Sequence, residues 1–166
     1  MITEPTSTIL DHCGDAPTEH YAPGNVLLDE GRRSGRLFIL SEGEVEVVRG
    51  GTVVAVISDP GAVFGEMSSL LDLPHTATVR ARTPVTVRAP LDAGRFLREH
   101  PEIAFHLARL LAQRLNAATT YLVDVKRQYD GRGDHLAMVG EVLEALTAQQ
   151  GRDFSPGPER SDDPRM

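Results

Sequence analysis

The sequence contains a single cysteine in 166 residues, and it has no long apolar run. One cysteine excludes an internal disulfide and a thiolate-rich zinc site, so we assign Cys13 no role and expect a free thiol in a mobile N-terminal segment. No stretch approaches the roughly 18 apolar residues of a membrane span, and the first residues lack the basic flank and apolar core of a secretory signal. We therefore expect a cytoplasmic protein.

Positive charge is also scarce, with 17 lysines and arginines against 24 acidic residues and a formal net charge of −7. This balance opposes the counterion release that drives nucleic-acid binding, so we expect neither DNA nor an anionic membrane as a partner. The sequence has no recognisable nucleophile motif and no Walker-type loop, which predicts no catalytic residue, no enzyme and no cofactor. The histidines lack the close spacing of metal ligands, so we predict no metal site.

Hydrophobic residues make up 40% of the chain and charged residues 25%, as in ordinary globular proteins. Short β-rich runs with glycine and proline between them extend from about residue 20 to 90. The alternating run 43–47, the Gly50 and Gly51 turn, and the run 52–57 predict a hairpin. The predicted fold class is α+β, with a double-stranded β-helix or jelly-roll barrel followed by helices.

A second strand pair is predicted at 76–81 and 85–88, joined through Thr83 and Pro84. A short helix after Gly65 is expected to interrupt the barrel between the two pairs. The expected organisation is an N-terminal segment at 1–19, one domain at 20–148 with its barrel at 20–90 and its helical part at 91–148, and a disordered tail at 149–166.

Helical periodicity begins after Pro90. We expect a short helix at 92–100, a long one from Pro101 to about Tyr129, and a further one at 135–147. In the long helix, apolar and small residues recur at spacings of four and three, which is typical of a dimer seam. The seam residues are Leu111, Leu115, Ala118, Leu122, Val125 and Tyr129.

The segment from Phe64 to Ala81 carries the chemistry of this chain. A glycine at 65 lets the backbone approach a ligand, and the helix that follows directs unpaired N–H groups toward an anion. Glu66 in the first turn of that helix can accept hydrogen bonds from a sugar hydroxyl. His75 and Thr76 offer an imidazole N–H and a hydroxyl to phosphate oxygens. A sugar phosphate is therefore the predicted ligand.

The same segment resembles the phosphate-binding cassette of cyclic-nucleotide-binding domains of the cAMP receptor protein family. That pattern runs Phe-Gly-Glu-Leu, then Pro-Arg, small residues and Ala-Thr-Val, and the chain follows it without a gap. The resemblance extends over about residues 20–130. It implies that Gly65 and Glu66 bind the phosphate and the ribose 2′-hydroxyl, and that Thr76 donates to the phosphate. It also implies that Thr119, from this or a partner subunit, lies near the purine. The implied site residues are Phe64, Gly65, Glu66, Met67, His75, Thr76, Ala77 and Thr119.

The chain departs from the family pattern at His75, where the family has arginine. Arginine supplies a permanent charge and a two-pronged fork that histidine cannot copy. A hydrogen bond to a charged group is worth about 1.5–3 kcal/mol, so the exchange weakens binding by roughly one to two orders of magnitude unless something compensates. The candidates to replace the charge are Arg32, Arg33, Arg36 and Arg80.

The resemblance implies a stand-alone cAMP or cGMP sensor that forms a homodimer, acts through an unknown protein effector and does not itself bind DNA. Three alternatives stay open. The first is a dimeric interaction module of the same fold that has lost the nucleotide. The second is a transcription regulator, which needs a helix-turn-helix within residues 131–166, where four arginines and no lysine face seven acidic residues. The third is a metal-dependent enzyme on a cupin-like barrel.

Overall fold

The computed structural model describes residues 8–128 and 135–148. The strands are β1 (Thr18–Tyr21), β2 (Val26–Leu28), β3 (Phe38–Glu42), β4 (Val45–Arg49), β5 (Thr52–Ile57), β6 (Val63–Phe64), β7 (Thr78–Ala81) and β8 (Val85–Arg88). The helices are α1 (Thr8–Asp11), α2 (Glu66–Leu71), α3 (Ala93–Glu99), α4 (Pro101–Gln128) and α5 (His135–Ala148). The chain divides into two compact units, residues 1–110 and 111–166, so that α4 contributes to both.

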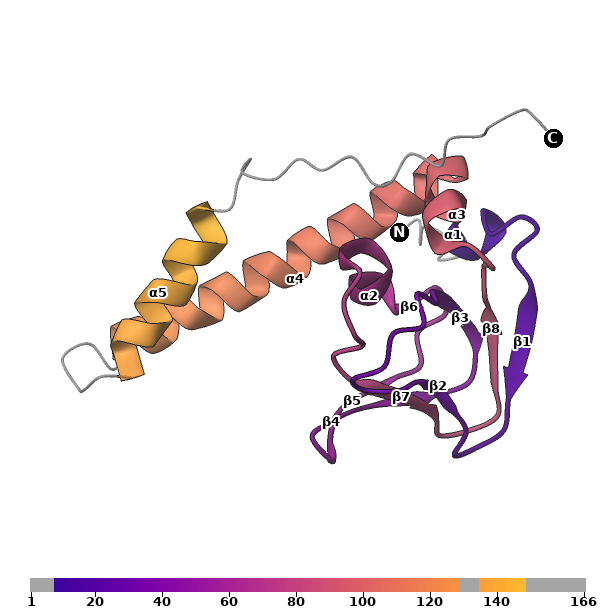
Figure 1. Ribbon diagram of the computed structural model, residues 1–166, viewed down its shortest axis with the longest axis horizontal. Helices are drawn as coiled ribbons and strands as arrows, with labels where there is room; N and C mark the ends of the chain where they lie inside the picture. The colour runs from indigo at the N-terminus through magenta and orange to yellow at the C-terminus, as the bar shows by residue number, and fades with distance from the viewer. Residues whose placement is uncertain (1–7, 129–134, 149–166) are drawn as a thin grey trace, which may run out of the picture. The chain divides into compact units, whose positions relative to one another are not determined.

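The first unit contains two four-stranded sheets in which the paired strands run antiparallel (Figure 1). The strand order is β1-β8-β3-β6 in one sheet and β2-β7-β4-β5 in the other. Residues from both sheets form one hydrophobic core, which shows that the sheets pack face to face. The structure therefore confirms the predicted α+β jelly roll.

Strands β3 and β8 supply the most deeply buried part of this core. Val85 and Val87 of β8 are almost fully buried, whereas Thr86 and Arg88, which alternate with them, are half-buried. Strand β3 does not alternate: its residues from Phe38 to Leu40 are all inaccessible to solvent. A strand covered on both faces needs no polar face, and this explains the continuous apolar run at 37–40.

The predicted hairpin is confirmed, and it joins β4 to β5. The two strands pair antiparallel, and the turn is formed by Gly50 and Gly51, which have φ angles of 57° and 77°. Positive φ at both central residues is the requirement of a type I′ turn.

The predicted pairing of the strands at 76–81 and 85–88 is wrong, because β7 and β8 lie in different sheets. The link between them crosses the edge of the barrel, where the N–H groups of Arg82 and Thr83 donate to the carbonyl of Glu44. Alternation of polar and apolar residues reports which face of a strand is buried. It carries no information about which strand lies beside it.

Ile9 and Cys13 are buried, whereas the sequence led us to expect Cys13 in a mobile segment. Cys13 is fully buried, and its thiol donates to the carbonyl of Ile9 at 3.3 Å. Burial is the main cause that raises the pKa of this thiol, so Cys13 is held in its inert neutral form.

The expected helices at 92–100, 101–129 and 135–147 correspond to α3, α4 and α5. Asp92 caps α3 by accepting a hydrogen bond from the backbone N–H of Arg95 at 3.1 Å. Tyr129, residues 130–134 between the two expected helices, and the expected tail at 149–166 lie outside the described residues. Among the helices that the structure describes, none combines the length and apolar character needed to cross a membrane.

Candidate ligand-binding site

Gly65 is the pivot of the candidate site, because it turns the chain from β6 into α2. Its φ angle is 84°, in the left-handed region, and a Cβ at this position would collide with the carbonyl oxygen of Arg36. Glycine is therefore required both by conformation and by space. The preceding Phe64 is buried and anchors the turn in the core.

Helix α2 has six residues, so it presents the free N–H groups of a single turn rather than the dipole of a long helix. Glu66 and Ser68 face inward and are only 7% and 4% exposed. Ser68 donates to the carbonyl of Leu73, and Ser69 donates to the carbonyl of Gly65 at 2.8 Å. Met67, predicted to belong to the site, is 45% exposed and points away from the core.

The loop between β2 and β3, residues 29–37, joins both halves of the candidate site. The N–H of Gly31 donates to the carbonyl of His75 at 2.9 Å, and the N–H of His75 donates to the carbonyl of Arg32 at 2.8 Å. The hydroxyl of Ser69 also donates to the carbonyl of Gly35 at 3.2 Å. This β2–β3 loop therefore contacts α2 on one side and the segment before β7 on the other.

The side chain of His75 is only 5% exposed, although it occupies the position at which the family pattern has a solvent-seeking arginine. Its Nε2 lies 2.6 Å from Oγ of Ser34 in the β2–β3 loop. Burial lowers the pKa of His75, and the carboxylate of Asp29 opposes that shift only in part. The imidazole of the free protein is therefore neutral at pH 7.

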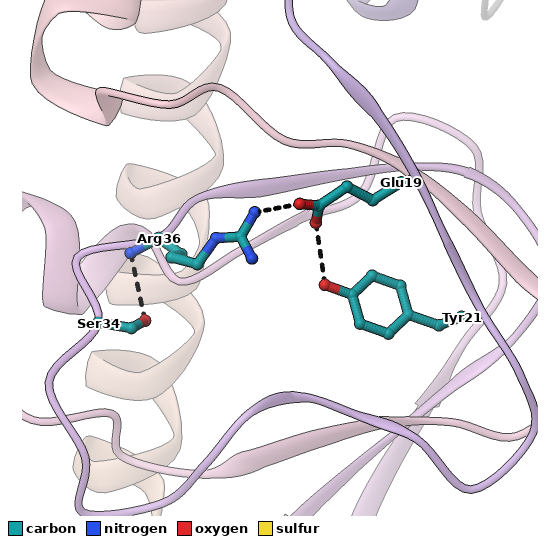
Figure 2. A network of polar contacts seen from close by, with 4 residues as sticks. All are labelled: Glu19, Tyr21, Ser34 and Arg36. Carbon is teal, nitrogen blue, oxygen red and sulfur yellow. Dashed lines mark hydrogen bonds and ion pairs between the residues drawn. The ribbon is translucent and has the colours of Figure 1, made fainter.

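Each of the four arginines proposed as replacements for the missing charge already faces a carboxylate. Arg36 forms a 2.6 Å ion pair with Glu19 and lies 4.8 Å from the centre of the Phe38 ring. Figure 2 shows its guanidinium directed toward Glu19, which also accepts a hydrogen bond from Tyr21. Burial acts to raise the pKa of Glu19, but these two hydrogen bonds and the charge of Arg36 together outweigh it, and the pKa is lowered.

The other three arginines form the following pairs: Arg32 with Asp29 at 3.5 Å, Arg33 with Asp72 at 3.5 Å, and Arg80 with Glu46 at 2.9 Å. Exposed pairs of this kind are weak, so a phosphate could compete for the guanidinium groups of Arg32 and Arg33.

Thr76 and Ala77 lie in the turn before β7, which begins at Thr78 and not at 76 as the sequence suggested. Thr76 is exposed, and Ala77 is half-buried. Thr119 lies on α4 within the second unit, half-buried, and its predicted approach to the purine stays a prediction.

Within the part of the chain that the structure describes, no three His, Cys, Asp or Glu side chains gather as metal ligands do.

Sequence reasoning missed Ser34, because a serine between arginine and glycine in a turn-rich stretch carries no sign of its tertiary partner.

The chain is similar to a known protein family and to several known proteins. The family model described as "Cyclic nucleotide-binding domain" matches residues 18–98. An uncharacterized ABC transporter ATP-binding protein of Mycobacterium bovis is 40% identical over 73 residues, which cover 42% of this chain and 22% of that protein. A CRP-like cAMP-activated global transcriptional regulator of Mycobacterium tuberculosis is 32% identical over 108 residues, which cover 61% of this chain and 48% of the regulator.

For one solved structure, the matched region covers a larger share of the related protein than it does for the two curated relatives. The N-terminal domain of a transcriptional regulator from Streptomyces coelicolor A3(2) superimposes with a TM-score of 0.51 at 30% identity, covering 70% of this chain and 86% of that domain. The two curated relatives are longer, and this chain spans from about a fifth to a half of their length.

Proposed function

The chain belongs to the cyclic nucleotide-binding domain family, and on this premise we propose that it is a sensor that binds cAMP or cGMP at residues 64–77 and acts through a protein effector. The observation that carries the proposal is the turn at Gly65. A side chain there is excluded by the β2–β3 loop, and the buried carboxylate of Glu66 follows directly. This arrangement allows a ligand to approach the backbone closely beside an acceptor for its hydroxyl groups.

In the proposed complex, the backbone at Gly65 and the hydroxyl of Thr76 donate hydrogen bonds to the phosphodiester. Glu66 accepts a hydrogen bond from the ribose 2′-hydroxyl, and burial of its carboxylate strengthens that bond relative to one in water. His75 contributes an N–H group in place of the guanidinium that the family pattern has. Thr119 is proposed to lie near the purine.

We also propose that the sensor is a homodimer joined through the seam on α4. Leu111, Leu122 and Val125 are half-buried within the second unit, whereas Leu115 is 48% exposed. An exposed leucine at the centre of a heptad-like series is suited to contact the same helix of a second copy. DNA binding is not part of the proposal, because the net charge of −7 opposes it.

A second candidate function is a dimeric interaction module of the same fold that no longer binds a nucleotide. Two observations favour it. His75 is neutral and buried where the family has a permanent cation. In addition, all four arginines that could compensate are paired with carboxylates.

The test is the melting temperature of the purified protein with millimolar cAMP, cGMP or 5′-AMP at pH 6.5. Ligand at 100 times its dissociation constant stabilises a fold by about 2.7 kcal/mol, which raises the melting temperature of a domain of this size by several degrees. A rise with one cyclic nucleotide and not with 5′-AMP supports the sensor. No rise with any of them supports the interaction module.

Two threonine variants connect that result to the site. Thr76→Ala removes an exposed hydroxyl, so it should leave the melting temperature of the free protein unchanged and abolish most of the ligand-induced rise. Thr18→Ala removes an exposed threonine hydroxyl from β1, outside the site, and should retain the full rise.

A further inference from the structure

We propose that Ser34 is a positioning residue of the ligand site, whose hydroxyl holds the His75 imidazole so that its Nδ1–H is presented to the phosphodiester. The inference rests on the proposed function and adds a residue outside the 64–77 segment. Ser34 lies 41 positions from His75 in the sequence, and only the fold brings the two side chains together.

The contact is short, and it joins a buried imidazole to an exposed residue of the β2–β3 loop. Ser34 Oγ and His75 Nε2 are 2.6 Å apart, and the imidazole is 5% exposed. Among the described residues, none forms a hydrogen bond with the other ring nitrogen, Nδ1. A buried imidazole with one nitrogen bound and the other without a protein partner is arranged to use the second nitrogen for a ligand.

The hydrogen bond is proposed to run from the Ser34 hydroxyl to Nε2 of His75. The Ser34 oxygen accepts a hydrogen bond from the backbone N–H of Arg36 at 3.3 Å (Figure 2). The hydroxyl proton of Ser34 can then be donated to Nε2 of His75. A neutral imidazole that accepts at Nε2 carries its proton on Nδ1. Ser34 thereby selects the tautomer that can donate to a phosphate oxygen.

This tautomer matters because burial disfavours a cation at His75, and the carboxylate of Asp29 opposes that effect only in part. Arg32 is paired with Asp29, and Arg33 is paired with Asp72, so the β2–β3 loop and the end of α2 present balanced charges on this side. Desolvation lowers the pKa of the ring. With Ser34 in place, the neutral ring still provides one N–H donor, and the site keeps a phosphate contact above the pKa of His75.

The same hydroxyl serves the protonated ring. Below its pKa, the imidazolium donates from both nitrogens, and Ser34 Oγ can reverse its role and accept from Nε2–H. The backbone of His75 is held from both sides by Gly31 and Arg32. Removal of the Ser34 hydroxyl should therefore leave the backbone of His75 in place and remove the contact that orients the ring and sets its tautomer.

Calorimetric titration with the tighter-binding cyclic nucleotide between pH 6 and 8.5 tests the inference. Ser34→Ala should bind about five- to tenfold more weakly than wild type at pH 8.5, corresponding to one hydrogen bond of about 1 kcal/mol. At pH 6 the loss should be less than threefold, because the imidazolium donates without help. Ser58→Ala, an exposed serine outside the site, should match wild type throughout.

A merely structural role for Ser34 predicts an equal loss at both pH values, and that result overturns the proposal. Ser34→Thr keeps the hydroxyl and should restore the wild-type pH profile. Nitrogen chemical shifts of His75 in the free protein at pH 8.5 supply a readout that needs no ligand: wild type should carry its proton on Nδ1, and Ser34→Ala should show a mixture. A wild-type proton on Nε2 refutes the positioning role, whereas failure of wild type to bind any cyclic nucleotide refutes the proposed function.

Discussion

At the scale of single residues, the exchange of arginine for histidine changes more than the charge of the site. An arginine carries its charge at any pH and would resist burial. His75 is buried, neutral at pH 7 and bound to Ser34, so the position has become part of the packed interior. The consequence is that its contribution to stability and its contribution to binding depend on pH in opposite directions.

The first prediction concerns the stability of the free protein. Because burial lowers the pKa of folded His75 below its ordinary value of 6.5, the unfolded chain binds more protons near that pH. This contribution is fully present above pH 6.5 and is lost as the pH falls through the folded pKa. The melting temperature of the free protein should therefore fall as the pH is lowered from 7.5 to 5.5. It should fall less for His75→Asn, whose side chain does not titrate. Identical slopes for the two proteins would contradict this role.

The binding of a cyclic nucleotide should depend on pH in the opposite direction. The phosphodiester anion favours the imidazolium, so the pKa of His75 rises in the complex and a proton is taken up on binding. The rise in melting temperature caused by a cyclic nucleotide should grow as the pH falls from 8 to 6, and in His75→Asn it should be independent of pH. A ligand-induced rise that is flat across this range in wild type is incompatible with contact between His75 and the phosphate.

Gly65 permits a matched test of what the turn requires. Gly65 and Gly24 have almost equal φ angles, 84° and 87°, but only at Gly65 would a Cβ meet another atom within 4 Å. Gly24→Ala should reduce the free energy of unfolding by about 1–2 kcal/mol through conformation alone. Gly65→Ala should lose about 1–3 kcal/mol more, because the β2–β3 loop must move. Urea denaturation measures both, and equal losses would show that the contact with Arg36 costs nothing.

At the scale of elements, the site is assembled by short segments rather than by long ones. Helix α2 has six residues and β6 has two, too few for either to be stable alone. Their support comes from the β2–β3 loop and from α3, which contacts α2. Helix α3 in turn leads directly into α4.

The prediction at the scale of elements concerns the N-terminal cap of α3. The carboxylate of Asp92 accepts a hydrogen bond from the backbone N–H of Arg95 at 3.1 Å, which satisfies a free donor of the first turn. Asp92→Ala should lower the free energy of unfolding by about 1 kcal/mol in urea denaturation. Asp92→Asn keeps an oxygen in the same place and should recover most of the loss. If both substitutions cost the same, the cap is not the source of the effect.

At the scale of the whole molecule, the two units have different characters. The first has a closed core of its own, whereas most of α4 beyond residue 110 is exposed or half-buried. The described residues leave apolar positions of α4 open, and a second copy of the same helix is the partner proposed here.

Sedimentation velocity tests this proposal with two substitutions that add the same charge to the same helix. Leu115→Asp places a carboxylate within the proposed seam and should convert the dimer into a monomer. Gln113→Asp adds it at an exposed position outside the seam and should leave the dimer intact. A wild-type monomer, or a dimeric Leu115→Asp variant, would show that the seam does not join two chains.

Much of the fold was predictable because it follows from local patterns. Alternation and glycine turns placed the β4–β5 hairpin, and a proline followed by helical periodicity placed α4. The partner strands of β7 and β8 were not predictable, because both strands alternate regularly and alternation does not identify neighbours. The burial of Cys13 was also missed, since a short apolar N-terminal run gives no indication of the surface against which it packs.

The sequence by itself determined the kind of fold, the position of the candidate site and the exchange at His75, because each depends on residue type and spacing along the chain. The tertiary structure alone decided that His75 is buried, that Ser34 meets it and that four arginines are already paired. The contact between Ser34 and His75 spans 41 positions, and it arises only when the β2–β3 loop packs against the segment before β7. The pKa of a histidine is set by the atoms around it, which its place in a sequence does not reveal.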